Sequence, residues 1–213
     1  MKLREPVNGL THFIGILLAI ASLPVLVVPA VEMGKTLHVV SFSIFSASMI
    51  LLYTSSTVYH WASVSPERLK TLRKIDHIMI FVMIAGSYTP IALIALKGGW
   101  GWSLFGVSWG ITVIGFFLKI FWLDMPRKIY VGLYLLMGWL VLIAIYPLSK
   151  SISSAALNWL LLEGAFYSVG AVIYAIKKPD FKYFGFHEIW HIFVLLGSFA
   201  QFMMLYLHIL YMD

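Results

Sequence analysis

Long apolar stretches separated by short polar gaps run through the whole chain. A helix needs about 20 mostly apolar residues to cross a bilayer, and seven stretches meet this requirement. They cover residues 9–30, 37–60, 76–96, 101–122, 128–148, 156–176 and 189–211. The gaps leave no room for a separate soluble domain. The pattern therefore predicts an all-α fold, an integral membrane bundle of seven transmembrane helices that forms a single domain over residues 1–213.

The composition agrees with lipid as the surrounding solvent. Of the 213 residues, 61% are hydrophobic and 11% are charged, which is more apolar surface than a soluble core of this size needs. The chain has no cysteine, which excludes disulfides, thiolate catalysis and cysteine-ligated zinc. The formal net charge is +6, but the charges lie in the gaps. We therefore expect membrane lipids as partners and no nucleic acid.

Lysine and arginine are distributed unevenly between the two sides of the predicted bundle. Twelve of the 15 lie before the first span or in the gaps after the second, fourth and sixth spans, and three lie on the other side. Because cytoplasmic loops are enriched in these residues, we expect a cytoplasmic N-terminus and a C-terminus outside. G-protein-coupled receptors have the opposite orientation. A retinal protein would need a lysine in its last span, and no lysine follows Lys182.

Histidines are concentrated at the predicted cytoplasmic ends of the spans. His187 and His191 are four residues apart, so on a helix they share one face and suit two ligands of one metal. His60 ends the second span at the same level. Three imidazoles and one open position are typical of a catalytic zinc site, where zinc lowers the pKa of its bound water. Asp76 is then a candidate proton acceptor or histidine partner, and Ser56 could hold the water or a substrate carbonyl.

Each of these residues also has a simpler interpretation. His60 by itself is typical of a water-facing residue at the membrane surface, and Asp76 of a loop charge or a helix N-terminal residue. We expect His12 and its neighbours Asn8 and Thr11 to form hydrogen bonds between helices, and His77 to face the interface.

Two glutamates stand out near these segments. The stretch from His187 to His191 reads H-E-x-x-H, in which Glu188 would be the general base of a metalloprotease. Intramembrane proteases of this kind take a third ligand from an Asp-Gly pair, and no aspartate here precedes glycine. Glu163 lies several residues inside the sixth span, towards its outer half, where an ionised carboxylate is costly. The sequence assigns it no role.

Several motifs together resemble hemolysin III and, more broadly, the progestin and adiponectin receptor family, over nearly the whole chain. The motifs are Glu5-Pro-Val-Asn8-Gly-Leu-Thr11-His12, Ser56-Thr-Val-Tyr59-His60, Asp76-His77, Ala85-Gly86-Ser87-Tyr88-Thr89-Pro90, then Gly164, Tyr167, Gly170 and Tyr174, and last His187 with His191. The chain is most similar in organisation to a bacterial member, because it lacks the long cytoplasmic N-terminal region of the animal receptors. We therefore expect a multi-pass protein of the bacterial plasma membrane.

The resemblance implies a zinc ion near the cytoplasmic face, with His60, His187 and His191 at the positions of the ligands. Ser56 and Asp76 match the serine and aspartate that lie beside the metal. The related alkaline ceramidases imply amide hydrolysis on a lipid, and other members are linked to membrane lipid homeostasis or carry a haemolysin label.

Three functions follow as hypotheses. The first is a zinc-dependent hydrolase of lipid amides or esters, with its lipid substrate inside the bundle. The second is a sensor or receptor of lipid homeostasis whose zinc is structural. The third is a pore-forming cytolysin, which the apolar middle of the bundle does not favour. The sequence also predicts close helix contact at Gly86 and Ser87, and a kink about one turn before Pro90 that opens a cavity beneath the metal. It does not predict the oligomeric state.

Overall fold

The computed structural model describes residues 3–182 and 184–213, and every regular element in them is helical. Seven helices in this part of the chain are long and apolar enough to cross a membrane. The predicted fold class is confirmed. The elements are α1 (Pro6–Glu32), α2 (Thr36–Trp61), α3 (Pro66–Pro90), η1 (Ile91–Leu96), α4 (Gly98–Phe121), α5 (Arg127–Gly138), η2 (Trp139–Ala144), α6 (Ile145–Ser151), α7 (Ser154–Ile176), α8 (Phe186–Met204) and η3 (Leu205–Ile209).

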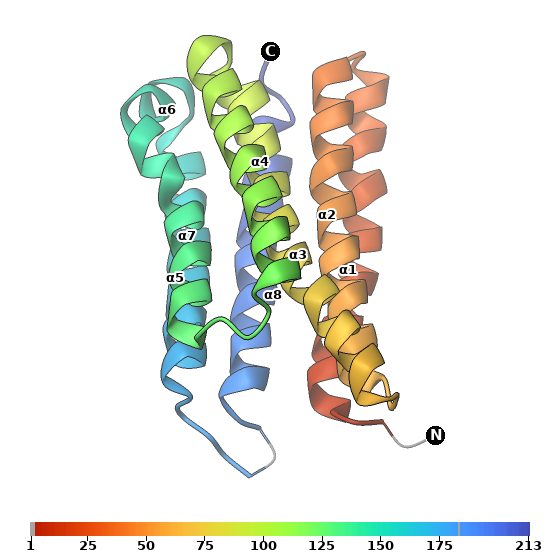
Figure 1. Cartoon of the computed structure of the whole chain (residues 1–213). Coiled ribbons are helices and arrows are strands. Elements are labelled where there is room, and N and C mark those ends of the chain that lie inside the picture. The colour runs from red at the N-terminus through yellow and green to blue at the C-terminus, as the bar shows by residue number, and fades with distance from the viewer. Residues whose placement is uncertain (1–2, 183) are drawn as a thin grey trace.

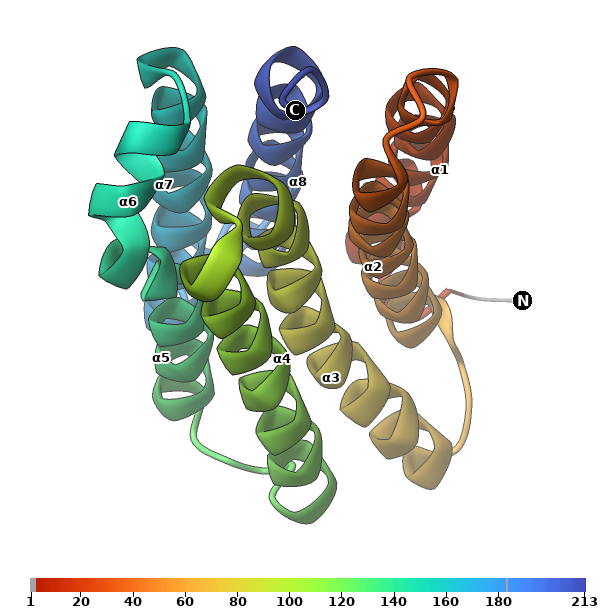
Figure 2. The ribbon, with the colours of Figure 1, turned by 90° about the horizontal axis from the view of Figure 1, so that it is seen from above.

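The spans run side by side, and the two termini lie at opposite ends of the bundle (Figure 1). Seen along the bundle, α8 lies between α7 and the pair α1–α2, which closes the arrangement (Figure 2). The span Pro66–Leu96 has the largest buried share among the seven. This central position explains why α3 and η1 line the interior cavity described below.

The third span begins earlier than the sequence predicts. Helix α3 starts at Pro66, with Ser65 as the preceding residue, so the expected start at residue 76 is wrong. Pro66 occupies the first helical turn, where its missing N–H costs nothing and its fixed φ favours the helix. The cationic residues between the second and third spans therefore lie on the first turns of a helix. Hydropathy alone underestimates the length of this helix, because its first turns are too polar to count as part of a membrane span.

Helix α3 continues without interruption from Pro66 to Pro90, and the predicted kink one turn before Pro90 stays a prediction. The helical pattern changes directly after the proline, where η1 adopts π-type hydrogen bonding. A π-type turn lets the chain pass the proline and still satisfy its backbone groups inside the membrane.

The fifth span is irregular in its middle, where η2 adopts 3-10 hydrogen bonding. The side chain of Tyr88 satisfies two backbone groups at this point. Its hydroxyl donates to the Gly138 carbonyl at 2.6 Å and accepts from the Val141 amide at 3.0 Å. Irregular backbone is tolerated at membrane depth when other protein groups satisfy it. Tyr88 thus joins the third span to the fifth.

Candidate metal centre

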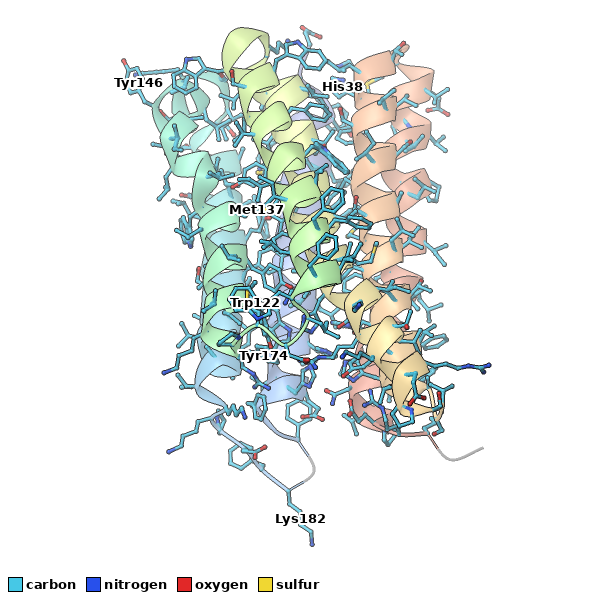
Figure 3. All side chains as sticks on the ribbon, in the orientation of Figure 1. His38, Trp122, Met137, Tyr146, Tyr174 and Lys182 are labelled. Atoms are coloured by element: carbon cyan, nitrogen blue, oxygen red, sulfur yellow. The ribbon has the colours of Figure 1, made fainter. Side chains whose placement is uncertain are left out.

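The structure brings His60, His187 and His191 together. His60 lies in the last turn of α2, and the other two lie in the first turns of α8. One ligand nitrogen from each histidine lies within 4.8 Å of the other two. The ring centroids are 4.9, 5.0 and 4.8 Å apart, with each pair edge to face. Tyr174, which contacts His187, lies towards the end of the bundle that carries Lys182 and opposite to His38 (Figure 3).

The first helix sets the protonation of His191. Its Nδ1 lies 2.9 Å from Thr11 Oγ1 and 3.1 Å from the Asn8 carbonyl oxygen. The Thr11 hydroxyl already donates to that carbonyl at 2.8 Å, so it accepts from His191. Both contacts therefore require the proton on Nδ1. The lone pair of Nε2 is left available for a metal.

A carboxylate sets the orientation of His60 in the same way. Glu5, directly before α1, contacts Nδ1 of His60 through its Oε2 atom. Burial tends to raise the pKa of the Glu5 carboxyl, but its contact with His60 and the nearby Arg4 outweigh burial and hold that pKa below its usual value. The ionised carboxylate accepts a hydrogen bond from Nδ1, which again leaves Nε2 for a metal.

The donor set fits a metal that prefers imidazole. A histidine ligand usually donates its second ring N–H to a carboxylate or a carbonyl, which fixes the tautomer and the ring orientation. His60 has such a carboxylate in Glu5, and His191 has such a carbonyl in Asn8. The three side chains come from two spans that are distant in sequence. The cluster can hold a metal ion.

Ser56 and Asp76 lie beside the histidines and line a cavity of about 130 Å³. The Ser56 hydroxyl hydrogen-bonds to the Asp76 carboxylate. Of the three histidines in the cluster, His187 and His191 line the same cavity. The wall beyond this polar end is mostly apolar, with contributions from α3, α5, α7 and α8. The cavity therefore has polar side chains beside the histidines and a mostly apolar remainder.

Two expectations about neighbouring residues are wrong, and a third residue, Glu188, has a structural role. His12 does not form a hydrogen bond between helices; its ring stacks on that of His191, with centroids 3.6 Å apart. His77 does not face the interface but is buried against Tyr130. Glu188 accepts from the amide of Gly185 at 2.9 Å and caps the start of α8. That capping role explains its place in the H-E-x-x-H pattern without a protease.

Two further residues at this centre escape a search for histidines and spans. Glu5 was visible only as part of a motif, because its contact with His60 crosses 55 residues of sequence. Tyr174 packs its ring against His187 with centroids 5.3 Å apart, and the guanidinium of Arg127 lies 4.4 Å from the same ring. An acidic residue directly before the first span was the available signal for Glu5. Tyr174 likewise appeared only as part of a motif, with nothing to indicate its contact with His187.

The fold and the histidine cluster define a multi-pass membrane protein with a group of histidines at one end of its bundle that could hold a metal ion. Residues 1–202 match the family model described as haemolysin-III related. The chain belongs to the haemolysin III family. It is 43% identical over 199 residues to the hemolysin-3 homolog of Bacillus subtilis (strain 168), covering 93% of this chain and 91% of that protein. It is 37% identical over 206 residues to hemolysin-3 of Bacillus cereus, with 97% and 92% covered.

Proposed function

We propose that this protein is a zinc-dependent hydrolase of lipid amides or esters that acts near the cytoplasmic leaflet of the bacterial plasma membrane. The observation that carries the proposal is that four polar residues line one largely apolar cavity: Ser56, Asp76, His187 and His191. His60 lies beside the two cavity histidines and completes the cluster. Three histidines without cysteine favour zinc among the metals that imidazole binds. Zinc held there would polarise a lipid carbonyl and activate water.

The other steps fall to residues of the chain. Asp76 accepts a proton from water as the water oxygen forms a bond to the carbonyl carbon. The same carboxyl returns that proton to the leaving nitrogen or oxygen as the bond between carbon and that atom breaks. The Ser56 hydroxyl, which hydrogen-bonds to Asp76, orients the carboxylate towards the cavity. The apolar wall holds the acyl chain and keeps bulk water away from the carbonyl.

The test is turnover by the purified protein on ceramide-like and acylated lipids, with and without added zinc. His191→Ala is expected to abolish metal-dependent hydrolysis, and Asp76→Asn to slow it about 10²–10⁴-fold, as loss of a general base does. His208→Ala is the matched control, because that histidine lies in η3 at the other end of the last span. Absence of metal-dependent turnover on every lipid would exclude the hydrolase.

A sensor with structural zinc is the second candidate, because the cluster joins α2 to α8 and its partner residues belong to α1 and the segment before it. Exchange of a metal-bound water with solvent distinguishes a catalytic zinc from a structural zinc. A hydrolase needs a metal-bound water that exchanges through the cavity, whereas a structural site is closed by protein ligands. Solvent relaxation measured with a paramagnetic substitute such as Co²⁺ would report an exchangeable water for the hydrolase and none for the sensor.

The names of the relatives suggest lysis as a third function. Dye release from liposomes tests it directly. A pore would release dye equally from the wild-type protein and from His191→Ala, because conduction does not need the metal. The hydrolase predicts no rapid release from intact liposomes by either protein.

A further inference from the structure

Glu163 has no role in the centre described above, yet its surroundings are unusual for a carboxyl group. It lies within α7, is 7% exposed, and its Oε2 atom has no hydrogen-bond partner among the described residues. It also lines the same cavity as Asp76 and His191. An unpaired carboxyl at membrane depth is costly and usually marks a functional position.

The hydroxyl groups near Glu163 are already used by the fold. Tyr88 and Tyr167 are close enough to interact electrostatically with the carboxyl. The Tyr88 hydroxyl is taken by the backbone of Gly138 and Val141. The Tyr167 hydroxyl lies 3.0 Å from that of Ser198. Because Oε2 of Glu163 has no hydrogen-bond partner in the part of the chain that the structure describes, it remains available to a molecule in the cavity.

The carboxyl lies far from the histidines along the cavity. Tyr174, whose ring is 5.3 Å from that of His187, lies eleven residues beyond Glu163 on α7, a rise of about 16 Å along the helix. The wall between the two levels is mostly apolar and includes Ile84 and Leu135. The cavity thus has polar groups at two levels, with a mostly apolar wall between them.

We propose that Glu163 is a second ligand subsite of this cavity. It binds a hydrogen-bond-donating group, a hydroxyl or an ammonium, carried at the far end of an aliphatic chain. The carbonyl or carboxylate end of the same molecule lies at the histidines, and for that end alone the inference rests on the proposed function. The ligand class is a long-chain lipid with polar groups at both ends of its chain.

Binding to the full-length zinc-loaded protein in lipid nanodiscs tests this subsite. The probes are long-chain fatty acids, the ω-hydroxy fatty acids of equal length and the ω-amino acids of equal length, measured by calorimetry over a series of chain lengths. At the matching length we expect an ω-substituted acid to bind about tenfold more tightly than the unsubstituted acid, as a hydrogen bond to a buried group predicts. Equal affinity of all three acids at every length would overturn the proposal.

Two variants at position 163 distinguish recognition of a hydroxyl from recognition of an ammonium. Glu163→Leu abolishes the preference for either substituted acid, because it removes both donor and acceptor. Glu163→Gln keeps the preference for the hydroxyl and loses that for the ammonium, because the amide hydrogen-bonds but carries no charge. A preference that survives in Glu163→Leu would overturn the proposal.

The stability of the ligand-free protein gives an independent readout. If the carboxyl serves a ligand, Glu163→Leu raises the melting temperature, because it removes an unpaired buried polar group. A lower melting temperature would assign the carboxyl to the fold and overturn the subsite. Hydrolysis is not needed for any of these measurements. If the protein hydrolyses no lipid but still binds the ω-substituted acids more tightly than the unsubstituted acid, only the hydrolase is refuted. If it hydrolyses lipids but binds all three acids equally, only the subsite is refuted.

Discussion

The carboxylate of Glu5 orients His60 by accepting a hydrogen bond from Nδ1. Two hydrogen bonds to backbone carbonyls at the end of α2 hold this segment in place. The Glu5 amide donates to the His60 carbonyl at 3.0 Å, and Arg4 Nη2 donates to the Tyr59 carbonyl at 2.8 Å. The segment before α1 is thereby attached to the end of α2. Glu5, which lies outside every span, thus sets the orientation of the His60 ring at the end of α2.

Glu5→Ala is expected to lower metal affinity about 10–100-fold, the usual cost of losing the partner of a histidine ligand. Competition with a chelator of known affinity measures this change. Glu67→Ala is the control, because Glu67 is an exposed carboxylate at the start of α3 and has no contact with the histidines. Equal affinities of wild type and Glu5→Ala would show that the carboxylate does not support the metal.

At the scale of elements, the close approach of α2 and α3 depends on one glycine. A Cβ added at Gly86 would lie 2.2 Å from Ser48 Oγ and 2.6 Å from Ser48 Cβ. The predicted close contact of the third span at this residue is confirmed. Transmembrane helices without side chains at such points gain packing contacts that lipid cannot replace.

Gly86→Ala is expected to destabilise the protein by about 1–3 kcal/mol, because the added methyl group overpacks the contact between α2 and α3. Gly110→Ala is the control, because no atom lies within 4 Å of the added Cβ there and alanine favours a helix over glycine by about 0.5–1 kcal/mol. Thermal unfolding in detergent compares the two variants. A Gly86→Ala protein as stable as the control would mean that the helices separate without loss.

For the whole molecule, a bound metal would join a helix from the N-terminal part of the chain to the last helix. His60 belongs to the second span and His187 and His191 to the last, so coordination would hold α2 and α8 together around α1. A ligand that binds only the folded state stabilises it by mass action, by about 2.7 kcal/mol when its free concentration is about 100 times Kd. The metal would then contribute to stability as well as to chemistry.

Chelation is therefore expected to lower the melting temperature of the wild-type protein by several degrees, since about 1 kcal/mol corresponds to roughly 2–4 °C in a chain of this size. The measurement is thermal unfolding at fixed protein and detergent concentrations, with and without chelator. His187→Ala is expected to unfold at the same temperature in both conditions. A wild-type protein indifferent to the chelator would argue against a metal in this cluster.

The sequence by itself determined the class of fold and part of the site. Lipid requires apolar helices of a minimum length, so composition and run length were enough to find seven spans. Helical periodicity placed His187 and His191 on one face, because it is a local property. The start of the third span was missed because polar residues continue a helix beyond the membrane, where hydropathy carries no information.

Only the tertiary structure decided how distant segments meet. Glu5 orients His60, Thr11 contacts His191 across 180 residues, and Glu163 lines the cavity that Asp76 enters. Such contacts depend on how each helix is rotated and which helices are neighbours, and many distant side chains settle both together. The sequence pattern predicts which face of a helix is polar, but it does not predict which residues of other helices that face contacts.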